Sequence, residues 1–279
     1  MSIYISNPKE VERKIGRIKK DGLKNLQILT DFDRTLTKAF VDGEPTPSIM
    51  KLLRSGTYIS PQYNDAADAL SKKYYPIEIN LTIPYEERRK AMEEWWTTHF
   101  DLLIKSGLNK KHLEQMVLNE KLQFREGALE MVDYLHQNNI PLVIISSSGL
   151  GETIPMLLKK HRRLYDNVHV ITNEYVWDSN GNAKGMQGPT IHVMNKDESA
   201  LKTLPVFETI AHRKNVILLG DSIDDLKMIG DFKYNNLLTL GFLDANVHAN
   251  RPAYQKAFDV VLEGNETFDY INELMEKIK

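Results

Sequence analysis

The stretch LQILTDFDRTLT, residues 26–37, decides the fold of this chain. Its first part, Leu26 to Thr30, predicts a short strand that is buried on both faces. Two acids, Asp31 and Asp33, follow as soon as this strand ends. Polar residues at the carboxyl end of a buried strand are typical of α/β proteins, which bind ligands at that edge of a parallel sheet.

Strands of the same kind recur along the chain, and helical patterns separate most of them. We expect strands at Ile140–Ser147, Asn167–Thr172, Asn215–Asp221, Asn235–Phe242 and Phe258–Gly264. We expect helices at Pro8–Lys20, Gly127–Asn138, Gly151–Arg162, Asp197–His212, Asp224–Gly230 and Ala249–Ala257. This alternation predicts an α/β fold with a doubly wound parallel sheet.

One long stretch interrupts the alternation. Between residues 45 and 123 there is no strong buried strand, and four helical patterns appear instead. They are Pro47–Arg54, Pro61–Tyr74, Pro84–Lys105 and Lys110–Glu120, and three of them begin at a proline, which favours the first helical turn. We therefore predict a core of residues 1–44 and 124–279 with an inserted helical cap of residues 45–123. A turn-rich segment at Tyr175–Thr190 predicts a small β-hairpin insertion.

Composition excludes several classes of protein. The chain has 279 residues and a formal net charge of −2, which gives no reason to expect nucleic acid or an anionic membrane as a partner. It contains no cysteine, so disulfides and thiolate chemistry are excluded. There is no secretory signal pattern and no apolar run of about 18 residues, so we expect a cytoplasmic protein without a membrane span, and a monomer is our working expectation.

Three further segments carry polar groups that suit phosphate chemistry. Ser147 and Ser148 follow a predicted strand and precede a helix, where backbone N–H groups attract anions. The nearby glycines fail the dinucleotide pattern GxGxxG, because its sixth position is Ile154. Lys196 lies at the expected start of a helix, where a cation is unfavourable unless an anion faces it. Asp221 and Asp225 follow another predicted strand and offer the oxygen ligands that Mg²⁺ requires.

Each of these signals alone also fits a plain structural role, such as a solvated loop acid, a serine N-cap or a surface lysine. Together they are much more specific, because the carboxyl ends of parallel strands lie at one edge of the sheet. The set then supplies a nucleophile, a proton donor, phosphate ligands and metal ligands. No P-loop pattern is present, and the histidines show no metal-binding spacing.

These motifs carry a family resemblance. DFDRTLT (31–37), Ser147, Lys196 and GDSIDDL (220–226) resemble, in order, the four motifs of haloacid dehalogenase-like phosphatases. Further segments resemble the cytosolic pyrimidine 5′-nucleotidase (type III) family over nearly the whole chain. They are KYYPIE (73–78), EWW (94–96), SGLG (148–151), IHVMNK (191–196) and LGFL (240–243).

The resemblance implies a role for each site residue. Asp31 would be the nucleophile that forms an aspartyl-phosphate, and Asp33 would protonate the leaving oxygen and then activate water. Mg²⁺ would be held by Asp31, the backbone carbonyl of Asp33 and Asp221, with Asp225 in support. Phosphate would be bound by Ser147, Ser148 and Lys196. Glu78 on the cap would contact the base of a nucleoside monophosphate, the expected small-molecule partner.

The cap also contains a departure from the family pattern. His99 occupies a position that is commonly a serine in the family, which bears on base preference. Trp95 and Trp96 offer aromatic faces on which a base could stack, although packing between cap helices is the plainer explanation. Two other functions stay open: a phosphatase or phosphotransferase acting on another small phosphate ester, and a non-catalytic receiver-like module, which also combines acids, a lysine and Mg²⁺.

Overall fold

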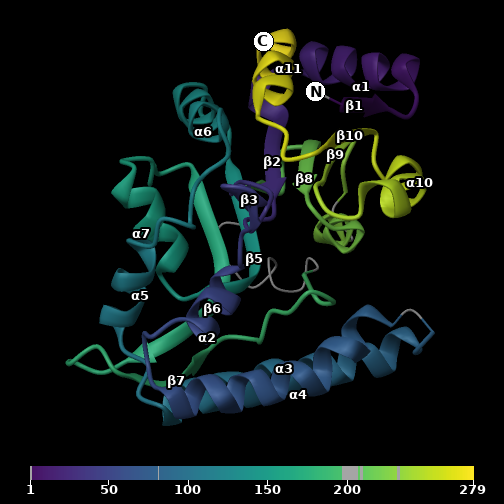
Figure 1. Cartoon of the computed structure of the whole chain (residues 1–279). Helices are drawn as coiled ribbons and strands as arrows, with labels where there is room; N and C mark the ends of the chain where they lie inside the picture. The colour runs from purple at the N-terminus through teal and green to yellow at the C-terminus, as the bar shows by residue number, and fades with distance from the viewer. Residues whose placement is uncertain (1, 81, 197–206, 208–209, 231–232) are drawn as a thin grey trace.

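The described part of the chain has at its centre an eight-stranded sheet in the order β1-β10-β9-β8-β2-β5-β6-β7 (Figure 1). The computed structural model describes residues 2–80, 82–196, 207, 210–230 and 233–279. The strands are β1 (Ser2–Ile5), β2 (Leu26–Thr30), β5 (Leu142–Leu150), β6 (Val168–Trp177), β7 (Ala183–Gln187), β8 (Asn215–Gly220), β9 (Asn236–Leu243) and β10 (Val260–Glu263). The strands from β10 to β6 run parallel to one another, whereas the edge strands β1 and β7 are antiparallel to their neighbours.

Both faces of the sheet are covered, as its apolar strands require. Successive side chains in a strand point to opposite faces. In β2, Ile28 accordingly packs in a large apolar cluster and Leu29 in a second, smaller one. The helices α1 (Pro8–Asp21), α6 (Ala128–Gln137), α7 (Thr153–Lys160) and α11 (Asp269–Ile278) contribute to the large cluster. The helix α10 (Val247–Ala257) packs against the small one. The predicted doubly wound sheet is confirmed.

The register of the central strands brings their carboxyl ends together. Thr30 of β2 pairs with Leu219 of β8 on one side and with Ile144 of β5 on the other. The residues that follow these strands therefore emerge at one edge of the sheet, and this edge holds the site described below.

The helices expected between residues 45 and 123 are present. They are α2 (Ile49–Ser55), α3 (Pro61–Ile79), α4 (Tyr85–Lys105) and α5 (Lys110–Val117). Ser48 and Ser60 cap α2 and α3, because their hydroxyls accept from the N–H groups of Lys51 at 3.3 Å and Tyr63 at 3.2 Å. The long helices α3 and α4 lie against each other across the carboxyl edge of the sheet (Figure 1). The division into a core of 1–44 and 124–279 and a cap of 45–123 stays a prediction.

Some elements differ from the expectation. The helix predicted at Asp197–His212 lies mostly outside the described residues. The segment predicted as a helix at Asp224–Gly230 is a 3₁₀ helix, η2 (Ile223–Ile229), whose Asp225 side chain turns back to the end of β8. The short ribbon β3 (Phe40–Val41) with β4 (Glu44–Pro45), the strand β1 and the helix α11 were not predicted.

The predicted hairpin is formed by β6 and β7, which pair antiparallel and extend the sheet. No helix within the described residues is long and apolar enough to cross a membrane.

Candidate active site

The carboxyl edge of the sheet and the helices α2–α4 enclose a cavity of about 520 Å³. Every residue predicted for the site lines this cavity: Asp31, Asp33, Glu78, Trp95, His99, Ser147, Ser148, Lys196, Asp221 and Asp225. The core residues come from the segments after β2 and β8, from the last part of β5 and from the segment that ends at Lys196, in the order of the motifs. The cavity therefore has a highly charged end on the sheet and an end under the helices that is richer in aromatic residues.

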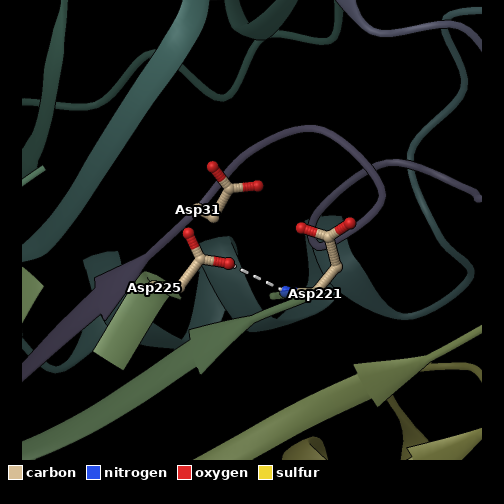
Figure 2. A group of neighbouring side chains, drawn as sticks. All are labelled: Asp31, Asp221 and Asp225. Atoms are coloured by element: carbon tan, nitrogen blue, oxygen red, sulfur yellow. Dashed lines mark hydrogen bonds between the residues drawn. The ribbon is translucent and has the colours of Figure 1, made fainter. Parts of the chain in front are cut away.

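Three carboxylates meet at the charged end. Asp31, Asp221 and Asp225 each offer an oxygen, and these oxygens lie within 4.8 Å of one another (Figure 2). Asp31 follows β2 directly, and its backbone N–H donates to Leu219 O of β8 at 3.0 Å. Its side chain is fixed further by the Thr35 hydroxyl, which donates to Oδ2 at 3.3 Å. The nucleophile predicted from sequence is thus held rigidly by the two central strands.

Lys196 is the cation of this cluster. Its ammonium group donates to Asp31 Oδ1 and, at 3.0 Å, to Asp225 Oδ1. The side chains of Lys196, Asp31 and Asp225 are all nearly inaccessible to solvent. Lys196 thus reaches the end of β2 from a loop about 165 residues later in the sequence.

Asp225 and Asp221 are held very differently. Asp225 Oδ2 accepts from the backbone N–H groups of Asp221 at 3.1 Å and Ser222 at 2.9 Å, so both of its oxygens have protein partners. The Asp221 carboxylate receives no hydrogen bond from the described part of the chain. Asp221 is therefore a free oxygen ligand, whereas Asp225 is suited to support the cluster.

The pKa values of Asp31, Asp221 and Lys196 are shifted from their usual values. Burial raises the pKa of Asp31 to about 7; Lys196 opposes this rise, and Asp225 adds to it. Burial, with Asp31 and Asp225, also raises the pKa of Asp221 well above its usual value. Burial alone would lower the pKa of Lys196, but Asp225 and Asp31 outweigh it and raise that pKa. A further cation would relieve this crowding of negative charge, and an all-oxygen donor set fits Mg²⁺.

Asp33 lies between the sheet and the helical segment. Its Oδ2 accepts a hydrogen bond from the Ser148 hydroxyl, and its Oδ1 accepts from the Ile49 N–H at the start of α2, at 3.2 Å. Burial raises the pKa of Asp33, against the opposing effect of these hydrogen bonds. Asp33 is therefore placed to hold a proton in the cavity, and Ser148 contacts the predicted acid as well as lining the phosphate end.

Ser147 is positioned through its backbone. Its carbonyl accepts from Asn173 Nδ2 at 2.9 Å, and the same amide donates to Ile191 O at 2.9 Å. Asn173 therefore links the part of β5 that carries the serines to the segment that carries Lys196. Sequence reasoning missed this buried asparagine, because it lies just after the predicted strand Asn167–Thr172 and the local sequence shows nothing of its partners.

At the other end of the cavity, Glu78, Trp95 and His99 approach from α3 and α4. Burial raises the pKa of Glu78 to about 7, and Asp224 adds to the rise. Trp95 exposes only 8 % of its surface and stacks on protein rings, with Tyr74 at 5.9 Å and Trp96 at 6.1 Å between ring centroids. Packing within the helical segment thus accounts for most of the Trp95 surface.

His99 is held by a tyrosine. Its Nε2 lies 3.0 Å from the Tyr63 hydroxyl, and burial, with Arg54 nearby, lowers the pKa of His99 to about 4. His99 is therefore neutral at physiological pH, and its imidazole lines the cavity.

Arg125 is a second residue that sequence reasoning missed. Its buried guanidinium donates to Thr35 O at 3.0 Å, to Glu266 O at 2.9 Å and to Arg34 O, and it pairs with Asp244 at 2.5 Å. It therefore fixes the loop that follows Asp31 and Asp33. Nothing in the local sequence marks it, because its partners are distant in the chain.

Comparison with known proteins extends this picture. The family model described as pyrimidine 5′-nucleotidase (UMPH-1) matches residues 34–279. A human protein named 7-methylguanosine phosphate-specific 5′-nucleotidase is 34 % identical over 278 residues, covering 99 % of this chain and 92 % of its own length. A Drosophila melanogaster protein of the same name is 31 % identical, covering 98 % of this chain and 86 % of its own length.

This chain is also similar to solved structures. The crystal structure of cytosolic 5′-nucleotidase IIIB bound to cytidine superimposes with a TM-score of 0.90 at 30 % identity, covering 99 % of this chain and 93 % of that one. A HAD family hydrolase from Salmonella enterica superimposes with a TM-score of 0.58 at 17 % identity, covering 90 % of this chain and 71 % of that one, which supports the fold alone.

Proposed function

This chain belongs to the pyrimidine 5′-nucleotidase (UMPH-1) family of HAD-like phosphoric monoester hydrolases, and we propose that it cleaves nucleoside 5′-monophosphates through an aspartyl-phosphate on Asp31. Membership of this family supports the hydrolysis of nucleotide monophosphates as its activity. The observation that carries the proposed mechanism is the contact of the Lys196 ammonium with Asp31, beside two further carboxylates. Such a centre brings together the nucleophile, Asp31, and the positive charge of Lys196, which the phosphorylation of Asp31 requires.

In the first step, Asp31 attacks the phosphorus, and the bond from phosphorus to the nucleoside O5′ breaks. A phosphate dianion repels a carboxylate, so the positive charge of Lys196 assists the approach. Ser147 and Ser148 supply polar groups for the phosphoryl oxygens. The products of this step are a phosphorylated Asp31 and a nucleoside whose O5′ has taken up a proton.

Asp33 provides that proton. Its raised pKa supports a protonated form before the first step, and its hydrogen bond from Ile49 N–H fixes one oxygen. In the second step Asp33, now ionised, accepts a proton from water as the water attacks phosphorus. The phosphorus–Asp31 bond breaks, which releases inorganic phosphate and restores both acids.

The acid cluster supports Mg²⁺ as the cofactor. Asp31 and Asp221 would hold the ion with the backbone carbonyl of Asp33, and Asp225 would support them, because its own oxygens already have protein partners. When bound, Mg²⁺ neutralises charge on the phosphoryl oxygens and orients the group.

The aromatic end of the cavity would hold the base. Glu78 accepts hydrogen bonds when ionised, so it favours bases that present N–H groups, such as cytosine with its amino group. The neutral imidazole of His99 would add a second hydrogen-bonding contact. We propose a pyrimidine nucleoside monophosphate as substrate, and 7-methylguanosine monophosphate as the second candidate because it appears in the names of the relatives. We also propose that the enzyme acts as a monomer in the cytoplasm.

The experiment is a phosphate-release assay over a panel of nucleoside 5′-monophosphates, including CMP, UMP and 7-methylguanosine monophosphate, with phosphoserine and a sugar phosphate as other esters. We expect turnover of at least one nucleotide with Mg²⁺, and loss of turnover with EDTA that Mg²⁺ restores. Faster turnover of phosphoserine or the sugar phosphate would favour the alternative phosphatase. Full activity after exhaustive chelation would contradict the metal site, and a single phosphorylation without release would favour a receiver-like module.

A further inference from the structure

The segment from Ile191 to Lys196 connects the core to the helical segment, and Lys196 stands at its end. Its core side is fixed by Asn173, whose Oδ1 accepts from Ile191 N–H at 2.7 Å. A turn follows, in which Asn195 Oδ1 accepts from His192 N–H at 2.6 Å. These bonds fix the beginning of the segment, and the helix α4 contacts the part nearer Lys196.

His192 makes the first of these contacts. Its side chain is fully buried, and its Nε2 lies 3.2 Å from Glu93 Oε2 of α4. The other ring nitrogen, Nδ1, accepts from Met194 N–H at 3.2 Å. A ring nitrogen that accepts a hydrogen bond carries no proton, so in the neutral imidazole the proton is on Nε2, which faces Glu93. His192 thus joins the backbone two residues before Lys196 to a carboxylate on α4.

Two further contacts act on the same backbone. The Tyr85 hydroxyl at the start of α4 donates to Met194 O at 2.7 Å. The Met194 side chain is buried with Tyr74, Met92 and Trp95, all from α3 and α4. Both polar groups of the Met194 backbone are therefore held, the carbonyl directly by α4 and the N–H through His192.

We propose that Glu93 is a positioning residue, which sets the place of Lys196 through His192 and the Met194 backbone. The inference rests on the proposed function, since Lys196 assists the attack of Asp31. Glu93 touches neither Lys196 nor the acid cluster in any contact found among the described residues. If Glu93 acts in this way, the packing of α4 against residues 191–196 places Lys196 at the charged end of the cavity. The same helix also covers the aromatic end of the cavity.

The test compares Glu93→Ala with Glu93→Gln. The Glu93 side chain is 54 % exposed, so its truncation opens no buried cavity, and the glutamine keeps a polar side chain of the same length beside His192 without the negative charge. Glu86→Ala is the matched control, because Glu86 lies two turns earlier on α4 and pairs only with Arg89 among the described residues, at 3.0 Å. Each variant is assayed with CMP and with p-nitrophenyl phosphate, which has no nucleoside for the helices to hold.

We expect Glu93→Ala to lower kcat about tenfold for both substrates with little change in the KM of CMP, since small displacements of a positioned group lower rates steeply. Glu93→Gln should recover most of this loss, and Glu86→Ala should match the parent. A higher KM for CMP alone would overturn the proposal, because Glu93 would then act on nucleoside binding. Unchanged kinetics, or equal losses in both Glu93 variants, would overturn it too. Failure of the parent to release phosphate from any nucleotide would instead contradict the proposed function.

Discussion

Replacement of Gly220 by alanine should disable the acid cluster although every charged residue of the cluster is kept. Gly220 ends β8, next to Asp221, and a Cβ built on it would lie 2.6 Å from Asp225 Cβ and 2.7 Å from Asp225 Oδ2. The backbone of β8 has little room to move away, because this strand is paired with β2 on one side and with β9 on the other. The Asp225 side chain must therefore move.

The required displacement can be estimated from these distances. Ordinary contacts begin at about 3.4 Å, so Asp225 must retreat by about 0.8 Å. That movement stretches its bonds from the N–H groups of Asp221 and Ser222 and its contact with Lys196. Overpacking of this kind destabilises a fold by about 1–3 kcal/mol. Misplacement of catalytic groups by about 1 Å can lower turnover about 10²-fold, and we expect a loss approaching that value.

The assay measures kcat and the Mg²⁺ concentration for half-activation with CMP, and urea unfolding reports stability. Gly185→Ala is the control, because Gly185 lies in the strand β7 and a Cβ added to it would meet no atom within 4 Å. The control should keep the parent's kinetics, whereas Gly220→Ala should lose turnover and need more Mg²⁺. Parental turnover and Mg²⁺ requirement in Gly220→Ala would refute the reasoning that Asp225 organises the cluster.

Three further predictions concern Asp31 and Glu78. Asp31→Asn should abolish phosphate release while circular dichroism and thermal unfolding stay those of a folded protein, because an amide of the same shape is a far weaker nucleophile; a rate within about tenfold of the parent would refute its role. Glu78→Gln should change the order of hydrolysis rates among nucleoside monophosphates and leave p-nitrophenyl phosphate hydrolysis nearly unaltered. Equal losses of rate for both kinds of substrate would mean that Glu78 supports the fold or the chemical step and not base recognition. The raised pKa of Glu78 also means that the parent loses stability relative to this variant as pH rises from 4.5 to about 7, by up to about 3 kcal/mol, which urea unfolding at pH 5 and pH 8 measures.

The charged end of the site was predictable because its residues follow strands that sequence reveals directly. A short and mostly apolar segment such as Leu26–Thr30, followed directly by acids, favours a buried strand, and parallel pairing brings all such strand ends to one edge. Asp31, Asp33, Ser147 and Asp221 therefore could be placed together from the sequence alone. The edge strand β1 was not visible in the same way, because most of its side chains are exposed and it has no buried run.

The residues that position this site were invisible for a different reason. Arg125, Asn173 and Glu93 act through contacts with backbone or side chains far away in the sequence. No periodicity or local spacing reports such a contact, since the information is in the tertiary arrangement. His99 is intermediate: its departure from the family pattern was visible, but its bond to Tyr63 and its lowered pKa follow from packing between α3 and α4.

The raised pKa values of Asp31, Asp33 and Asp221 have a consequence for stability. A carboxylate whose pKa rises on folding opposes folding when it is ionised, so these acids destabilise the protein at neutral pH. Perturbed acids of this kind gather where a site must bind charge, because a cation or a phosphorylated group relieves the same repulsion. The large apolar clusters on both faces of the sheet supply the stability that offsets it. The unfavourable electrostatics of the sheet edge are therefore the source of its affinity for Mg²⁺ in the proposed mechanism.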